Sequence, residues 1–266
     1  MSRELLRVAG LSCRFGGLTA VDGLDLTLRA GDLAGLIGPN GAGKTTVFNL
    51  LTGRVPATAG AVSFQGQAVL GLKSHQINRL GIGRTFQNIR LFGELSVLDN
   101  VLVGFHGRLQ ASFLSAIFRL SAYRREERRT LARAEELLEL VGLQDLAGEA
   151  AGNLAYGQQR LLEIARALAT EPSLLLLDEP AAGMNPQETA SLAGLVRRLR
   201  DDLGLTVLLI EHDMRFVMSL CEHITVLDYG KVIAWGTPEE VQGDPAVIQA
   251  YLGAGLDQAR GEAGHA

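Results

Sequence analysis

The sequence predicts an α/β fold, with a mostly parallel sheet covered by helices on both faces, and three features support this prediction. A glycine-rich loop with a lysine, residues 38–46, follows an apolar run and leads into a helical pattern. Residues 173–177 and 205–210 are apolar on both faces, as strands covered on both sides must be. The amphipathic stretch 189–203 between them predicts a crossover helix, so these three segments form a βαβ unit.

Size and composition limit the kinds of protein that this chain can be. A chain of 266 residues, 47% hydrophobic and 20% charged, is typical of a soluble α/β enzyme with a substantial core. Its net charge of −4 gives no general attraction to nucleic acid. Cys13 and Cys221 lack metal-ligand spacing and are expected to be reduced residues of a cytosolic protein. No signal peptide is expected, and the apolar runs are far shorter than the roughly 20 residues that span a bilayer.

The first part of the chain predicts antiparallel strands. Short apolar runs over residues 5–30 are separated by glycines, as in hairpins. Residues 61–69 predict a further hairpin that turns at Gly66. Phe15 is an ordinary hairpin aromatic unless an adenine stacks on it. The glycines that separate the first runs are Gly10, Gly16, Gly17 and Gly23.

The glycine-rich loop has the pattern G-x-x-x-x-G-K-[ST] in the strand-loop-helix context that it requires. Glycines let successive backbone N–H groups converge at a helix N-terminus, which makes a concave anion site. Lys44 can reach the outer phosphates, and the Thr45 hydroxyl can join a Mg²⁺ shell. The alternative, a turn that carries a lysine by chance, is disfavoured because lysine is rare in this chain. A nucleoside triphosphate is therefore expected to bind Gly38, Pro39, Asn40, Gly41, Ala42, Gly43, Lys44, Thr45 and Thr46.

The middle of the chain changes to a helical period between residues 95 and 170. It ends in a clear predicted helix over residues 158–169. The N–H of Gly157 and the dipole of this helix could present positive potential to a phosphate. Taken alone, an ordinary helix N-terminus is the plainer interpretation.

Two adjacent acids, Asp178 and Glu179, follow the apolar strand 173–177. In a sheet buried on both faces, acids can lie only at the open carboxyl end, where α/β folds bind ligands. Asp178 would hold Mg²⁺, directly or through water, opposite Thr45. Glu179 suits a general base or an orienting group for the attacking water. The alternative is a solvated Asp-Glu-Pro turn, which the nucleotide loop in the same chain disfavours.

Two further residues are ambiguous by themselves. His212 comes just after the strand 205–210, so it would lie at the same edge of the sheet and could hydrogen-bond a γ-phosphate. Position alone does not separate this role from that of an ordinary loop histidine. Gln87 is by itself an unremarkable surface glutamine. A last hairpin is predicted over residues 225–233 with an Asp-Tyr-Gly turn.

In this order and spacing, the motifs resemble the ATP-binding subunit of an ABC transporter, over about residues 5–253. The resemblance implies a P-loop NTPase core with an N-terminal antiparallel β subdomain and a helical subdomain insert. It identifies Phe15 as the adenine-stacking aromatic, residues 38–46 as Walker A, and Asp178 and Glu179 as the Walker B pair. It also implies that Gln87 is the Q-loop glutamine, catalytic and a Mg²⁺ ligand with Thr45 and Asp178, and that His212 is the catalytic switch histidine. The signature motif spans residues 154–158, and its residues Ala155, Tyr156, Gly157 and Gln158 would bind ATP.

Several segments are similar to importers of branched-chain (hydrophobic) amino acids, including an insert near residues 105–130. They are residues 83–92, 153–160, 178–186, 210–214 and 236–253. Two departures from the general ABC pattern occur. Ala155 and Tyr156 stand where the signature has serine and its first glycine, and Asn185 replaces an aspartate. Both are taken as marks of this subgroup.

The resemblance implies an ATPase that powers amino-acid import through membrane permeases, with ATP and Mg²⁺ as cofactors. Two ATPase subunits, identical or homologous, would bind head to tail, with each ATP between one Walker A loop and the other signature. Residues 87–102 would dock the permeases at the cytoplasmic face of a bacterial inner membrane, and a periplasmic solute-binding protein would act indirectly. Alternatives are a urea, amide or lipid-export transporter or a soluble ABC ATPase without a transport role.

The chain is expected to form a single ABC domain. Residues 1–87 and 168–253 would make the core and the β subdomain, residues 88–167 the helical subdomain, and residues 254–266 a frayed tail. Within the insert, residues 113–120 could lie on a membrane surface, but packing against a neighbouring helix is favoured.

Overall fold

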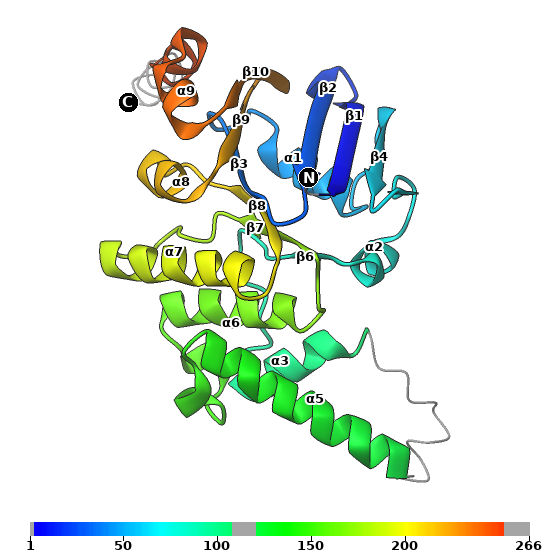
Figure 1. Ribbon diagram of the computed structural model, residues 1–266, viewed down its shortest axis with the longest axis vertical. Helices are drawn as coiled ribbons and strands as arrows, with labels where there is room; N and C mark the ends of the chain where they lie inside the picture. Colours follow the sequence, from blue (N-terminus) through cyan, green and yellow to red (C-terminus); the bar gives the residue numbers. More distant parts are fainter. Residues whose placement is uncertain (1–2, 108–120, 253–266) are drawn as a thin grey trace.

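The computed structural model describes residues 3–107 and 121–252, which form two sheets and a set of covering helices (Figure 1). The small sheet is antiparallel, in the order β2-β1-β4-β5. It consists of β1 (Glu4–Phe15), β2 (Leu18–Arg29), β4 (Ala59–Phe64) and β5 (Gln67–Ala68).

The large sheet has the order β10-β9-β3-β8-β7-β6 and is parallel except at β10. Its strands are β3 (Leu33–Ile37), β6 (Ile82–Arg84), β7 (Leu174–Asp178), β8 (Thr206–Ile210), β9 (His223–Asp228) and β10 (Lys231–Gly236). The carboxyl ends of β3, β6, β7 and β8 therefore meet at one edge, as the predicted α/β fold requires.

The helices lie on both faces of the large sheet. They are α1 (Lys44–Leu51), α2 (Ser74–Leu80), α3 (Val97–Phe105), α5 (Ser121–Leu140), α6 (Tyr156–Leu168), α7 (Pro186–Asp201), α8 (Met214–Leu220) and α9 (Pro238–Gly243). Figure 1 shows α6, α7 and α8 on the side of the sheet away from β1 and β2, with α3 and α5 beyond α6. None of the helices within the described ranges is long and apolar enough to cross a membrane.

Alternate side chains of the central strands pack into two different cores. In β7, Leu175 and Leu177 contact the core formed with the helices α3, α5, α6, α7 and α8. Leu174 and Leu176 contact the core that includes α1 and the small sheet. Because both faces are covered, the strand must be apolar at every position, which explains the pattern seen in the sequence.

Several elements differ in detail from the predictions. Gly10 and Gly23 lie inside β1 and β2, because each takes a positive φ at a register shift that lets the strand continue. Helix α7 begins at Pro186, three residues earlier than predicted, since Asn185 caps it and proline fits the first position. Helix α6 begins at Tyr156, which places Gly157 in its first turn.

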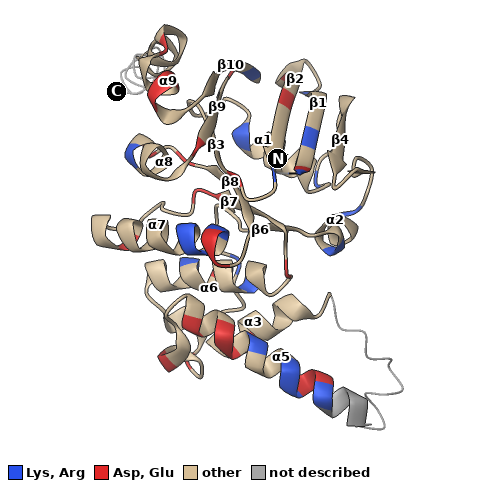
Figure 2. Cartoon of the chain, in the orientation of Figure 1, with Lys and Arg blue, Asp and Glu red and all other residues tan. Residues whose placement is uncertain are grey.

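Helix α5 carries interspersed charges along its length (Figure 2). Arg125, Glu127, Arg128 and Arg129 are exposed, as mixed charges on a solvated helix face are. The predicted packing segment, residues 113–120, and the predicted frayed tail, residues 254–266, lie outside the described residues.

A fully buried asparagine, Asn100 in α3, fixes the chain that leads into this helix. Its Oδ1 accepts from the Phe92 N–H (2.9 Å), and its Nδ2 donates to the carbonyls of Phe92 and Ser96 (3.0 Å each). Asn100→Ala leaves the Phe92 N–H without an acceptor and removes a donor from both carbonyls, so we expect unfolding free energy to fall by about 1–3 kcal/mol in urea titrations. The exposed Asn153→Ala is the control; equal losses in both variants would contradict this role.

Candidate functional site

The phosphate loop between β3 and α1 can be built only with glycine at two places. Gly38 has φ +149°, and a Cβ there would lie 2.0 Å from the Leu227 carbonyl oxygen. Gly43 has φ +103°, and its Cβ would lie 2.3 Å from the Ala20 carbonyl oxygen. Ala20 belongs to the β1–β2 hairpin that also carries Phe15, which is about half exposed. The loop is therefore packed tightly against β9 and against the predicted adenine-binding hairpin.

Lys44 opens α1 and is almost completely buried. Its Nζ donates to the carbonyls of Gly38 (2.7 Å) and Pro39 (2.8 Å), so the ammonium lies against the start of the loop. Burial lowers the pKa of Lys44, while the charges of Glu179 and Asp178 act in the opposite direction. The structure thus brings the predicted lysine and both predicted acids into one electrostatic environment.

Asp178 ends β7, and only 1% of it is exposed. Its Oδ2 accepts from Arg84 Nη2 at 2.7 Å. Burial raises the pKa of Asp178, and the hydrogen bond and charge of Arg84 oppose that rise. Its Oδ1 is buried and has no hydrogen-bond partner among the described residues. An unpaired carboxylate oxygen beside a phosphate loop suits Mg²⁺, which prefers oxygen ligands.

Arg84 is a site residue that the sequence analysis missed. Besides Asp178, its guanidinium donates to Asn49 Oδ1 (2.8 Å) and Thr52 Oγ1 (3.1 Å), both near the end of α1. It therefore ties the helix of the phosphate loop to the end of β7. The only sign of this role in the sequence was that Arg84 lies in a short stretch with Ile82 and Phe86, just before Gln87.

The structure brings the three predicted catalytic residues together. Gln87 Nε2 donates to Glu179 Oε2 at 3.1 Å, and His212 Nδ1 lies 3.8 Å from the same oxygen. Glu179 has φ +49°, an uncommon conformation for a residue with a side chain. Such backbone strain is retained where the surroundings fix it, often at functional sites.

Glu211 is a second residue that the sequence did not reveal. It is buried, and its carboxylate accepts from the backbone N–H groups of Ala181 (2.8 Å) and His212 (3.2 Å). Burial raises its pKa, opposed by those backbone hydrogen bonds. His212 Nδ1 lies 3.8 Å from Glu211 Oε2, so this carboxylate helps to orient the histidine. Its signal was an acid directly after β8, equivalent to Glu179 after β7, because Ile210 pairs with Asp178.

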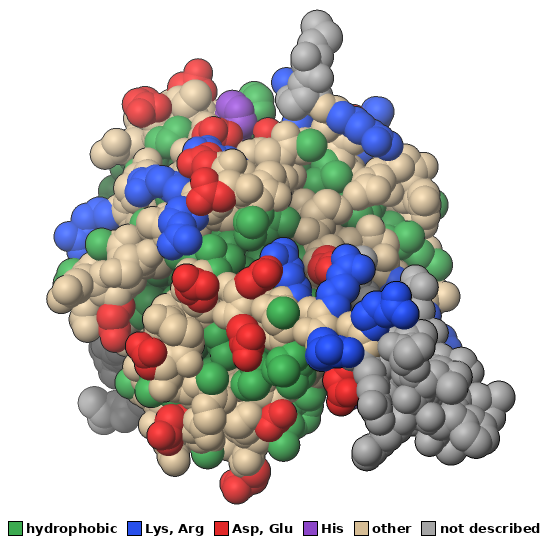
Figure 3. Space-filling view, turned by 60° about the horizontal axis from the view of Figure 1, so that its bottom comes forward, with side chains coloured by type: hydrophobic (Ala, Val, Ile, Leu, Met, Phe, Trp, Pro, Cys, Tyr) green, Lys and Arg blue, Asp and Glu red, His purple; other side chains and the backbone are tan. Residues whose placement is uncertain are grey.

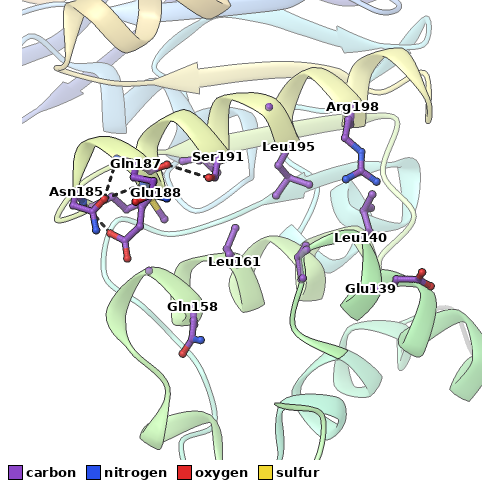
Figure 4. Close-up of a pocket in the computed structure, with 16 residues that line it drawn as sticks. Glu139, Leu140, Gln158, Leu161, Asn185, Gln187, Glu188, Ser191, Leu195 and Arg198 are labelled. Carbon is purple, nitrogen blue, oxygen red and sulfur yellow. Dashed lines mark hydrogen bonds between the residues drawn. The ribbon is translucent and has the colours of Figure 1, made fainter. Parts of the chain in front are cut away.

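The signature residues lie at the start of α6. Within the described residues, no hydrogen bond or ion pair joins residues 155–158 to Lys44, Asp178 or Glu179. Instead, Gly157 and Gln158 line a groove of about 810 Å³ between the end of α5, α6 and α7. Figure 4 shows Gln158 on one wall, and Asn185 and Glu188 on the other.

The start of α7 forms one end of this groove. Asn185 Oδ1 accepts from the N–H groups of Gln187 (2.9 Å) and Glu188 (3.0 Å), while Glu188 Oε2 accepts from the Asn185 N–H (2.8 Å). A Cβ on Gly157 would lie 2.9 Å from Glu188 Oε1, so the Glu188 carboxylate lies directly beside this glycine. Asn185, which replaces the aspartate of the general ABC pattern, thus caps α7. Its hydrogen bond with Glu188 holds the Glu188 carboxylate beside the signature residue Gly157.

Comparison with known proteins identifies the family of this chain. A family model described as an ABC transporter matches residues 21–182, and one described as a branched-chain amino acid ATP-binding cassette transporter matches residues 231–257. The chain is 51% identical to the high-affinity branched-chain amino acid transport ATP-binding protein BraF of Pseudomonas aeruginosa, over 95% of this chain and 99% of that protein. LivG of Escherichia coli, which carries the same description, is 49% identical over the same shares.

Solved structures of ATP-binding cassettes are similar to this chain. The ADP conformation of MJ1267, an ATP-binding cassette of an ABC transporter, superposes with a TM-score of 0.83 at 34% identity, covering 95% of this chain and all of that one. A dimeric post-hydrolysis structure of the cassette MJ0796, bound to ADP and Pi, gives a TM-score of 0.75 at 25% identity, covering 88% and 99%. The chain therefore belongs to the ABC transporter family and is one of its ATP-binding, ATP-hydrolysing proteins.

Proposed function

We propose that this chain powers the import of branched-chain or other hydrophobic amino acids through partner membrane permeases. The main support for this proposal is the cluster of Gln87, Glu179 and His212 beside the phosphate loop. In addition, the chain shares about half its residues with BraF and LivG over nearly its full length. Urea, amide or lipid transport is disfavoured by that similarity. The chain would act peripherally at the cytoplasmic face of the membrane, supplied by a periplasmic binding protein, and would work as a single ABC domain.

We assign the nucleotide contacts as follows. Phe15 stacks on adenine, residues 38–46 surround the phosphates, and His212 contacts the γ-phosphate. The ligands of Mg²⁺ are Thr45, Gln87 and Asp178, with the unpaired Oδ1 of Asp178 as the supporting observation. When bound, Mg²⁺ neutralises charge on the phosphate oxygens.

Glu179 is the proposed general base. Gln87 Nε2 and His212 Nδ1 both approach its Oε2, which leaves Oε1 to accept a hydrogen bond from the attacking water. A carboxylate held at one oxygen accepts a proton at the other without losing its orientation. The strained φ of Glu179 fixes the direction in which the side chain leaves β7.

Two copies, or this chain and a homologous subunit, would close head to tail around ATP. The supporting observation is that Gly157 and Gln158 line a groove away from the phosphate loop of their own chain. The N-terminus of α6 is then available to a phosphate held by another chain. The related cassette MJ0796 is dimeric in the solved structure.

A permease would dock near Phe86, where arginines gather. The guanidinium groups of Arg54 and Arg90 lie 4.6 Å and 5.0 Å from the Phe86 ring centroid, next to a cavity of about 310 Å³ between α2, β6, α3 and α6. Neither guanidinium is ion-paired with a carboxylate in the described part of the chain, although the Arg90 backbone N–H donates to Glu163 Oε1 at 2.9 Å. Figure 3 shows Lys and Arg side chains grouped on one side of the helical end of the molecule. An acidic permease segment suits this surface.

The test is ATP-driven leucine uptake into proteoliposomes that contain the permeases and this chain. The wild type should transport leucine and not urea. Arg90→Glu repels an acidic docking segment, so we expect uptake to fall by about tenfold or more while ATP affinity stays unchanged.

Arg7→Glu, an exposed charge reversal on β1, is the matched control and should transport normally. Normal uptake by Arg90→Glu would place the permease elsewhere. Uptake of urea in preference to leucine would overturn the proposed substrate.

A further inference from the structure

One buried arginine joins the start of α6 to the backbone around Gln87. Arg160 is 3% exposed, and its Nη1 donates to the Phe86 carbonyl at 2.7 Å. Its Nη2 donates both to the Gln87 carbonyl and to the Tyr156 hydroxyl, the latter at 2.9 Å. A planar guanidinium is suited to hold two adjacent carbonyls in a fixed geometry.

Tyr156, one turn before Arg160, is itself held in place. A Cβ on Gly183 would lie 2.9 Å from Tyr156 Cε1, so the tyrosine ring lies directly on the Gly183 backbone. Gly183 has φ +77° and belongs to the segment between Glu179 and α7. The Arg160 guanidinium lies 5.3 Å from the centroid of the same ring. Tyr156 therefore connects Arg160 to the segment that follows the proposed general base.

The backbone of Gln87 is held more firmly than its side chain. Gln87 is exposed, and Glu179 is the only residue in the described ranges to which its side chain is hydrogen-bonded. Its carbonyl, in contrast, is fixed by Arg160. Because carbonyl and side chain leave the same Cα, fixing the carbonyl limits where the amide can reach.

We infer that Arg160 is a positioning residue for ATP hydrolysis: oriented by the Tyr156 hydroxyl, it holds the Gln87 backbone so that the Gln87 amide reaches Glu179. This inference rests on the proposed role of Glu179. It also gives a purpose to Tyr156, since a glycine at that place would supply neither the ring on Gly183 nor the hydroxyl for Arg160. The rival interpretation is that Arg160 only neutralises the buried carboxylate of Glu163, 3.5 Å away.

A double-mutant cycle separates the two interpretations. The purified full-length chain is assayed for steady-state hydrolysis at saturating Mg·ATP and for equilibrium binding of a fluorescent ATP analogue. Arg160→Lys keeps the charge beside Glu163 but cannot hold both carbonyls, so we expect kcat to fall about tenfold with the Kd unchanged within about twofold. In the Gln87→Ala background, the same substitution should cause no further loss of kcat.

Tyr156→Phe is the second variant, chosen because Tyr156 is 46% exposed and the ring is retained. Losing the hydroxyl should lower kcat about threefold, again only when Gln87 is present. Arg133→Lys, on the exposed surface of α5, is the control and should leave kcat unchanged. Two results would overturn the inference. One is a wild-type kcat in Arg160→Lys; the other is a fall in kcat that is as large in the Gln87→Ala background as in the wild type. The role of Glu179 is tested independently by Glu179→Gln.

Discussion

Glu179→Gln is expected to bind ATP with nearly wild-type affinity and to lose hydrolysis by about 10²–10⁴-fold. The substitution keeps size and shape, and the new amide oxygen can still accept from Gln87 Nε2, which is 3.1 Å from Oε2 in the native chain. Only the carboxylate that takes a proton from the attacking water is lost. Lys44, the phosphate loop and Asp178 are untouched, so binding should persist.

The same variant should form an ATP-stabilised dimer, because the nucleotide that joins two chains is no longer cleaved. Light scattering after size-exclusion chromatography with Mg·ATP measures this, beside steady-state phosphate release. Glu222→Gln, which removes an exposed carboxylate paired with Arg200, is the control and should turn over normally. Unchanged hydrolysis in Glu179→Gln would remove Glu179 from the role of general base.

The sequence was sufficient for the fold class and for the parts of the site that follow long apolar strands. The run Leu174–Leu177 and the acids after it identified the edge of the sheet, because a strand buried on both faces tolerates acids only at its end. The phosphate loop was equally clear, since Gly38 and Gly43 satisfy steric demands that leave a fixed pattern in the sequence.

The sequence was insufficient where a contact joins distant segments through short elements. Strand β6 has three residues, too few for a periodic pattern, so neither its pairing with β7 nor the contact of Arg84 with Asp178 was expected. Arg160 and Glu211 are ordinary charged residues in the sequence; only the fold shows that they are buried and bonded. The start of α6 was placed two residues late because Ala155 and Tyr156 give no capping signal.

Lys44→Ala is expected to raise the Kd for ATP by about 100-fold or more. The lysine is almost buried at the first position of α1, with its Nζ held against the loop by the carbonyls of Gly38 and Pro39. Hydrogen bonds from an ammonium to phosphate oxygens are charge-assisted and therefore strong, and no other lysine of the chain follows the glycines of this loop. The loop N–H groups and the helix dipole alone retain a weak anion site.

Two measurements check this expectation in the folded protein. A fluorescent ATP analogue gives the Kd by equilibrium titration, and the rise in melting temperature on adding ATP gives it independently, because a ligand that binds only the native state stabilises it by about 2.7 kcal/mol at 100 times its Kd. Lys73→Ala, an exposed lysine just before α2, is the matched control and should bind like the wild type. A cooperative melting transition without ATP shows that the Lys44→Ala chain is folded. Wild-type affinity in a folded Lys44→Ala chain would show that the phosphates bind elsewhere. The roles proposed for Asp178, Glu179 and His212 would then be contradicted too, because each assumes a phosphate bound at this loop.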